Sequence, residues 1–184
     1  MKVPVKVGVL VGSLSKESIN RRLAKALKTL APDNIELIDI DIADLPLYNR
    51  DADADYPQVA RDFKAQLNDV DALLYVTPEY NRSIPSVLKN AIDWASRPWG
   101  QNSLGKPSAT IGASMGPLST AVAQQHLKQI LVFSDAPLMG QPEGYIHFTP
   151  DLISDDGTVN NPETREFLAN WINAYAEFVH KQRG

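Results

Sequence analysis

The sequence of 184 residues contains no cysteine. This absence excludes disulfides, thiolate nucleophiles, cysteine-held iron–sulfur clusters and cysteine-bound zinc. Any redox chemistry must therefore depend on an organic cofactor. Histidine is scarce too, and His126, His147 and His180 stand far apart in the sequence. We expect no metal site.

A large excess of charge of either sign is also missing. The 18 Lys and Arg residues and 22 Asp and Glu residues give a formal net charge of -4. Proteins dedicated to nucleic-acid binding usually have a basic face, so we expect no nucleic-acid partner. No apolar run approaches the roughly 18–20 residues of a membrane span, and the short run from Val5 to Val11 ends in a glycine turn unlike that of a signal peptide. We expect a cytoplasmic protein.

Strand-like and helix-like apolar patterns alternate along the chain. The expected strands cover residues 5–11, 35–40, 71–76 and 107–114, with a short strand near 136–139 and extended chain near 145–148. The expected helices cover residues 19–30, 59–70, 85–95 and 118–132, and a last, aromatic-rich helix begins at Pro162 after a capping Asn161. The pattern predicts one α/β domain over residues 1–184, with a doubly wound parallel five-stranded sheet and helices on both faces.

Ligands of such sheets bind beyond the carboxyl ends of the strands, where the strand order reverses. The loop after the first strand, residues 12–20, reads GSLSKESIN and leads into a helix. Backbone N–H groups at a helix start attract anions, and this loop adds three hydroxyls and an amide. It is neither a Walker P-loop nor a G-x-G-x-x-G turn, so it suits a terminal monophosphate. Arg21 and Arg22 follow, either beside that phosphate or pointing into water.

The loop after the third strand, residues 77–85, reads TPEYNRSIP. Its two prolines stiffen a segment that could direct backbone N–H groups at a flat heteroaromatic ring. Tyr80 could pack beside that ring, and Asn81 offers both a donor and an acceptor. The alternative is a purely structural turn that caps the helix beginning near Pro85.

The loop after the fourth strand, residues 112–117, reads GASMGP. It matches G-x-S-x-G, the nucleophile elbow of α/β-hydrolases, with Ser114 as the nucleophile. That motif needs an acid and then a histidine downstream. Asp135 or Asp151 could supply the acid, but His147 precedes Asp151 and His180 lies near the end of a helix. No oxyanion segment is present, and the chain is short for that fold. We therefore favour a turn of small residues whose backbone approaches a ligand closely, and serine hydrolysis is the less favoured alternative.

Together, the three loops resemble the NADPH-dependent FMN reductase family of flavodoxin-like proteins, and especially its quinone and chromate reductases. The resemblance spans nearly the whole chain. Its strongest part is the run P-E-Y-N-R-S-I-P followed by L-K-N-A-I-D-W, which lies between residues 78 and 94. It implies a flavodoxin-like fold, FMN as the cofactor and NADPH or NADH as the co-substrate.

The resemblance also implies which residues bind FMN. The phosphate would be held by Ser13, Ser18 and Asn20, with Ser15, Lys16 and Ile19 in the same loop, although Ser15 stands where close relatives often have arginine. The isoalloxazine ring would be framed by Pro78, Glu79, Tyr80 and Asn81, and its other edge by Ser114, Met115 and Gly116. Glu79 could either orient the backbone or be exposed. No side chain is expected to be catalytic, because the flavin carries the chemistry.

The implied activity is ping-pong, with two-electron transfer from NAD(P)H through FMN to quinones and, opportunistically, to chromate or other oxidants. The alternative in another functional class is a flavodoxin-like electron carrier or a regulatory flavin-binding module. The resemblance implies a homodimer or homotetramer, with Trp94, Arg97 and Trp99 near the interface. Trp99 would cover a neighbour's flavin, or else Trp94 is core and Trp99 simply lies in a loop. Glu143 and the helix over 118–132 could add a tetramer contact.

Overall fold

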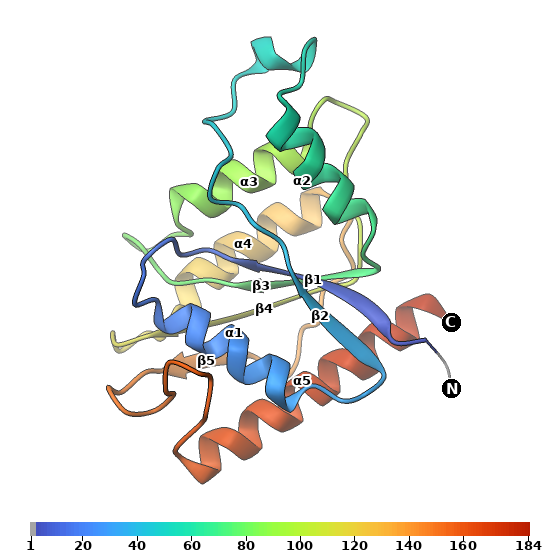
Figure 1. Cartoon of the computed structure of the whole chain (residues 1–184). Coiled ribbons are helices and arrows are strands. Elements are labelled where there is room, and N and C mark those ends of the chain that lie inside the picture. Colours follow the sequence, from blue (N-terminus) through green and yellow to red (C-terminus); the bar gives the residue numbers. More distant parts are fainter. Residues whose placement is uncertain (1–2) are drawn as a thin grey trace.

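Five parallel strands form the central sheet of the computed structural model, which describes residues 3–184 (Figure 1). The strands are β1 (Val5–Val11), β2 (Ile35–Asp39), β3 (Ala72–Val76), β4 (Ser108–Ser114) and β5 (Gly144–His147). Their order in the sheet is β2-β1-β3-β4-β5. All five residues of β3 are buried, as a strand covered by helices on both faces requires. The parallel five-stranded sheet predicted from the sequence is confirmed.

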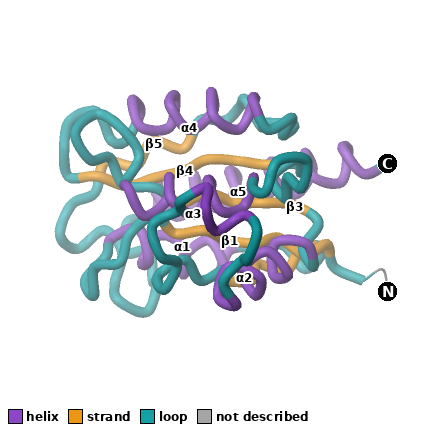
Figure 2. Tube along the Cα trace, turned by 90° about the horizontal axis from the view of Figure 1, so that it is seen from above, coloured by secondary structure: helices purple, strands orange, loops and turns teal. Residues whose placement is uncertain are grey.

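Helices cover both faces of this sheet. They are α1 (Ile19–Leu30), α2 (Gln58–Asn68), α3 (Ser86–Ser96), α4 (Ala121–Phe133) and α5 (Pro162–Arg183), with a short 3-10 helix at Arg50–Asp53. The buried side chains of α1 and α5 share one core with β1, β3 and β4, whereas α2, α3 and α4 enclose a second core on the opposite face. Figure 2 shows the molecule from one edge of the sheet to the other, with β5 and α4 towards one edge and β1, α1 and α2 towards the opposite edge.

Two expected elements differ from the structure. The helix expected from residue 118 begins only at Ala121, because Ser119 and Thr120 adopt positive φ angles of 44° and 71°. The fifth strand is Gly144–His147, where extended chain was expected near 145–148, and not the segment near 136–139, where Leu138 forms only an isolated bridge to Ser108. A Cβ on Gly144 would lie 2.5 Å from Ile111, so glycine permits this strand to pair so closely with β4.

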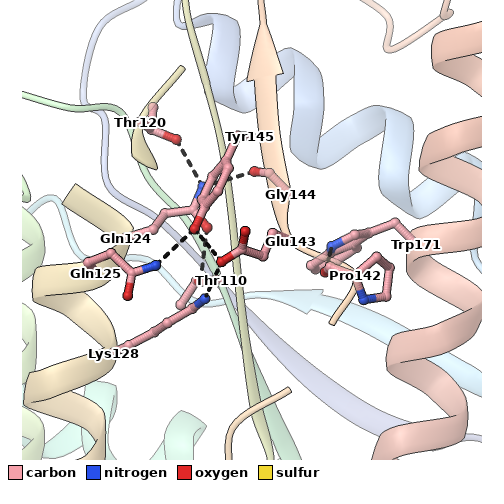
Figure 3. Close-up of polar contacts among 10 residues, drawn as sticks. All are labelled: Thr110, Thr120, Gln124, Gln125, Lys128, Pro142, Glu143, Gly144, Tyr145 and Trp171. Atoms are coloured by element: carbon pink, nitrogen blue, oxygen red, sulfur yellow. Dashed lines mark hydrogen bonds and ion pairs between the residues drawn. The ribbon is translucent and has the colours of Figure 1, made fainter. Parts of the chain in front are cut away.

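Helix α5 closes one face of the sheet, as its aromatic stripe predicts. Asn161 caps it by accepting a hydrogen bond from the Thr164 amide at 2.8 Å. Trp171 and Tyr175 are fully buried, and the Trp171 indole donates to the Pro142 carbonyl (Figure 3). Within residues 3–184, no helix combines the length and the hydrophobicity needed to cross a membrane.

Candidate functional site

The three loops that the sequence singled out meet at one edge of the sheet. Parallel strands end at the same edge, and the strand order reverses between β1 and β3. A pocket of ≈ 300 Å³ lies at this point. It is lined by Ser13, Ser15, Glu17, Ser18, Ile19, Asn20, Pro78, Glu79, Tyr80, Ala113, Ser114, Met115 and Gly116. All the predicted site residues except Lys16 and Asn81 are in this lining, and Asn81 lines an adjoining pocket of ≈ 330 Å³.

The loop before α1 presents an unusual run of backbone donors. The Gly12 amide donates to the Val76 carbonyl at 2.9 Å, but the amides from Ser13 to Asn20 have no acceptor within residues 3–184. Ser13 is only 6% exposed, yet its hydroxyl forms no hydrogen bond within the same residues. Ser18 caps α1 by accepting from the Arg21 amide at 3.3 Å. These donors and the positive end of the helix dipole make the loop suitable for an anion.

The two arginines after this loop have different surroundings. Arg21 Nε donates to the Ser13 carbonyl at 3.2 Å, which keeps its guanidinium beside the loop. Arg22 instead forms an ion pair of 2.6 Å with Asp155, and so its charge is engaged by the segment before α5. Lys16 is exposed. The sequence did not decide whether these two arginines lie beside a phosphate or point into water. Of the two, the structure places only Arg21 where it can add positive charge to the anion site.

Asn20 joins the first and third loops. Its Nδ2 donates to the Ala113 carbonyl and its Oδ1 accepts from the Ala113 amide, both at 2.9 Å. The side chain is 1% exposed. The resemblance implied that this amide holds a phosphate, but its oxygen and one of its N–H groups are already bound to β4. Asn20 therefore fixes the distance between the two loops, and only its second N–H remains for a ligand.

The loop after β3 is a tight turn. Tyr80 and Ser83 exchange two backbone hydrogen bonds of 3.0 Å, and the two residues between them, Asn81 and Arg82, have positive φ angles of 51° and 62°. This is the geometry of a type I′ turn. The amides of these two central residues have no acceptor among the residues that the structure describes. The Tyr80 side chain is 54% exposed, so its ring is accessible.

Glu79 is not an exposed carboxylate. Its side chain is 9% exposed and pairs with Arg82 at 3.2 Å through Oε1. Oε2 accepts a hydrogen bond of 3.0 Å from the Ala123 amide in the first turn of α4. Of the two alternatives from the sequence, the structure therefore favours a carboxylate that orients the backbone. The sequence did not indicate its partner in α4.

The third loop lacks the base that a nucleophilic serine needs. Ser114 Oγ accepts from the Gly116 amide at 3.0 Å, and His147 Nδ1 lies 3.4 Å from the Gly116 carbonyl. Within residues 3–184, no histidine is within hydrogen-bonding distance of Ser114 Oγ. A Cβ on Gly112 would lie 2.1 Å from the Thr77 carbonyl, so this glycine allows β3 and β4 to approach at the site. The loop is therefore a close backbone turn, as the favoured interpretation predicted.

The predicted interface tryptophans separate into one core and one surface residue. Trp94 is 1% exposed and donates to the Pro46 carbonyl. Trp99 is 78% exposed, with the Arg97 guanidinium 5.7 Å from its ring centroid. In the described part of the chain, no group of three or more His, Asp or Glu side chains is arranged to hold a metal. The groups that the site offers to a ligand are the backbone amides of its loops, the hydroxyls of its serines and the exposed ring of Tyr80.

Residues 5–151 match the model of the NADPH-dependent FMN reductase family. The chain belongs to this family. It is 49% identical over 180 residues to a 2-hydroxy-1,4-benzoquinone reductase of Burkholderia sp, a match that covers 97% of this chain and 98% of that relative. A quinone reductase of Pseudomonas putida is 45% identical, with 96% of each chain covered.

The solved structure of FerB, a flavoenzyme NAD(P)H:(acceptor) oxidoreductase from Paracoccus denitrificans, has a TM-score of 0.92 and 43% identity. That match covers 96% of this chain and 98% of the other. These findings confirm the predicted family, the flavodoxin-like fold and the class of flavin-dependent oxidoreductases. They favour an enzyme over an electron carrier or a serine hydrolase.

Proposed function

We propose that the protein is an FMN-dependent NAD(P)H oxidoreductase that reduces quinones. The observation that carries this proposal is the meeting of the three loops at the strand-order reversal, with unpaired amides at the start of α1. Two relatives that are at least 45% identical over nearly their whole length are named as quinone reductases. In this proposal the residues of the three loops would hold FMN, which would supply the acceptance of a hydride from NAD(P)H and the transfer of two electrons to the acceptor.

The chain's first task is to hold the flavin phosphate. We assign this to the amides from Ser13 to Asn20 and to the hydroxyls of Ser13 and Ser18, with Ser15, Lys16 and Ile19 bordering the same loop. The fit is supported by the amides that have no acceptor in residues 3–184 and by the Ser13 hydroxyl, which forms no hydrogen bond within those residues and is free to bind a ligand. Arg21, which lies beside the Ser13 carbonyl, adds a positive charge. A dianionic phosphate is favoured by all of these groups.

Its second task is to position the ring and balance its charge. Pro78, Glu79, Tyr80 and Asn81 would border one side, and Ser114, Met115 and Gly116 the other. The unpaired amides of Asn81 and Arg82 can donate to negative charge that develops on a reduced ring. No side-chain acid or base is required in this assignment.

Its third task is to admit a flat acceptor. The side chains of Tyr80 and Met115 are 54% and 65% exposed at the pocket, and they offer apolar surface on which a quinone can rest. We propose that NADPH or NADH and the acceptor use this place in turn, and that chromate and other oxidants are opportunistic acceptors. We propose that this apolar surface selects acceptors mainly by their flat shape.

An anaerobic spectroscopic titration tests the function. The FMN-loaded protein is mixed first with NADPH or NADH and then with a quinone, and free FMN at the same concentration is the control. We expect the visible flavin band to bleach with the nucleotide and to return with the quinone. A bound flavin that neither nucleotide bleaches would favour the carrier. A protein that does not bind FMN would refute the proposal.

We further propose that copies of the chain associate as a homodimer or homotetramer. Trp99 is 78% exposed in the segment after α3, and Val132 and Phe133 at the end of α4 are 63% and 75% exposed, so apolar surface is available for such contacts. Glu143, which the resemblance offered as a tetramer contact, already accepts a hydrogen bond from the Tyr145 hydroxyl and lies 3.6 Å from Lys128 within the same chain (Figure 3). Sedimentation velocity tests this: a monomer at micromolar concentration would contradict it. The cytoplasmic location stays a prediction.

A further inference from the structure

Glu79 connects two segments whose backbones are both strained. On its own side, Asn81 and Arg82 have φ angles of 51° and 62°; on the other, Ser119 and Thr120 precede α4 with angles of 44° and 71°. Residues without the freedom of glycine hold such conformations only where the surrounding structure fixes them. The contacts between the turn at residues 79–83 and α4 therefore join two segments that both depend on their surroundings.

Helix α4 lacks a cap from its own sequence. Thr120 stands at the cap position, but its side chain forms no capping hydrogen bond, and its hydroxyl instead accepts from Gln124 Nε2 at 2.9 Å. The first amides of a helix have no partner within it. Glu79 Oε2 provides one by accepting from the Ala123 amide at 3.0 Å. A carboxylate is favoured here because it also meets the positive end of the helix dipole.

The first turn of α4 is itself firmly attached to the sheet. Gln124 is fully buried. Its Oε1 accepts from Thr110 in β4 at 3.0 Å, and its Nε2 donates both to Thr120 and to the Gly144 carbonyl in β5 at 2.9 Å (Figure 3). Every polar atom of this side chain is thus satisfied, and such networks rigidify their surroundings. A segment bound to the start of α4 is therefore held relative to β4 and β5.

A second contact joins the same turn to the same helix. Ser83 Oγ lies 3.2 Å from His126 Nδ1, one helical turn beyond Ala123. This contact is exposed, whereas the bond from the Ala123 amide to Glu79 is partly buried and the Glu79 side chain is only 9% exposed, so water competes less with Glu79. The geometry makes Glu79 the main connection between the turn and α4.

We propose that Glu79 is a positioning residue that acts through the Ala123 amide. It holds the turn at residues 79–83 against α4 and thereby fixes the unpaired amides of Asn81 and Arg82 toward the flavin ring. Its carboxylate has no direct contact with the ring in this proposal. The proposal rests on the proposed function, since it takes the ring to lie against that turn.

Three variants test the proposal. In Glu79→Gln the amide oxygen can still accept from Ala123, whereas Glu79→Ala removes the acceptor. Glu163→Ala is the matched control, because Glu163 is an exposed carboxylate in the first turn of α5, outside the site. We measure the Kd for FMN by quenching of FMN fluorescence, the visible circular dichroism of bound FMN, and hydrogen exchange of the Ala123 amide in the FMN-free protein. Far-UV circular dichroism checks that each variant folds.

We expect Glu79→Ala to weaken FMN binding by about tenfold, to change the dichroism of the bound flavin and to speed exchange at Ala123, because a charge-assisted hydrogen bond is lost. Glu79→Gln should stay within about threefold of the wild type in Kd, and Glu163→Ala should match it. If Glu79 acts by holding the turn in position, glutamine can replace it. If it acted through its negative charge, Glu79→Gln would bind FMN as weakly as Glu79→Ala.

The proposal is overturned if Glu79→Ala binds FMN with wild-type affinity and dichroism, or if Glu79→Gln is as weak as Glu79→Ala. Failure of the wild type to bind FMN is a different result, since it refutes the proposed function. Exchange at Ala123, which needs no flavin, then still decides whether Glu79 holds the turn to the helix. Unchanged exchange in Glu79→Ala would contradict that contact itself.

Discussion

Asn20→Ala is the most informative change to the framework of the site. The variant removes both hydrogen bonds between α1 and the Ala113 peptide, each 2.9 Å long. Because Asn20 is 1% exposed, the Ala113 amide and carbonyl would lose their partner in a place that water reaches poorly. The perturbation therefore acts on a contact between two of the three loops without touching the hydroxyls of the anion site.

The magnitude follows from the two groups left without a partner. Each buried polar group that loses its hydrogen bond costs about 1–3 kcal/mol. Partial entry of water into the small space left by the side chain reduces the sum, so we expect a loss of about 2–4 kcal/mol in the free energy of unfolding. With a urea dependence of roughly 2 kcal/mol per molar, this corresponds to a midpoint about 1–2 M lower.

The assay is urea unfolding of the FMN-free protein, followed by circular dichroism. Asn173→Ala is the control, because its amide donates only to the Ala169 carbonyl on the exposed surface of α5 and should change stability by no more than about 0.5 kcal/mol. A midpoint for Asn20→Ala as close to the wild type as that of the control would refute the reasoning. FMN affinity should fall in Asn20→Ala as well, because the first and third loops lose their fixed spacing.

Three further predictions concern the sheet and its cores. Tyr75→Phe should leave stability unchanged or raise it by about 1 kcal/mol, since the buried Tyr75 hydroxyl has no partner in residues 3–184. Tyr175→Phe should lower stability by about 1 kcal/mol, because it loses the 2.8 Å hydrogen bond to the Leu73 carbonyl. Thermal melts of the two variants test this difference. Burial raises the pKa of both tyrosines. Both phenols therefore ionise at lower pH in the unfolded chain, near pH 10, than in the folded one. Stability does not depend on their ionisation below about that pH and falls as the pH rises above it, so urea midpoints should fall on the alkaline side and fall less in the double Phe variant. Gly112→Ala should destabilise by about 3 kcal/mol, because its Cβ would overlap the Thr77 carbonyl; Gly140→Ala, which meets no atom within 4 Å, is the control, and equal melting temperatures would contradict the close approach.

The fold could be predicted where local patterns decide it. Helix α1 covers the residues 19–30 that its apolar pattern predicted, Asn161 caps α5 as predicted, and the fully apolar β3 has the pattern of a strand buried on both faces. The start of α4 could not be predicted, because the left-handed Thr120 depends on contacts with the sheet. The fifth strand was misplaced for a similar reason: its pairing depends on the close approach of Gly144 to Ile111, and no local pattern encodes that approach.

The residues of the candidate site were found from three loops and a family resemblance, but their individual functions needed the structure. Asn20 binds Ala113, 93 positions away in the sequence, and Glu79 binds Ala123, 44 positions away. Sequence proximity to a phosphate loop or to a ring-binding turn gives no sign of such partners. Both side chains would be assigned to direct ligand contacts by position alone, whereas their hydrogen bonds show that they hold loops in place.

The proposed function depends most on the loop before α1, which holds FMN by its phosphate in this proposal. The most direct test compares the dissociation constants of FMN and riboflavin, which lacks the phosphate, by flavin fluorescence under identical buffer and salt conditions. The unpaired amides from Ser13 to Asn20 predict that FMN binds at least about 100-fold more tightly, which corresponds to about 2.7 kcal/mol. Equal affinities for FMN and riboflavin would contradict the account.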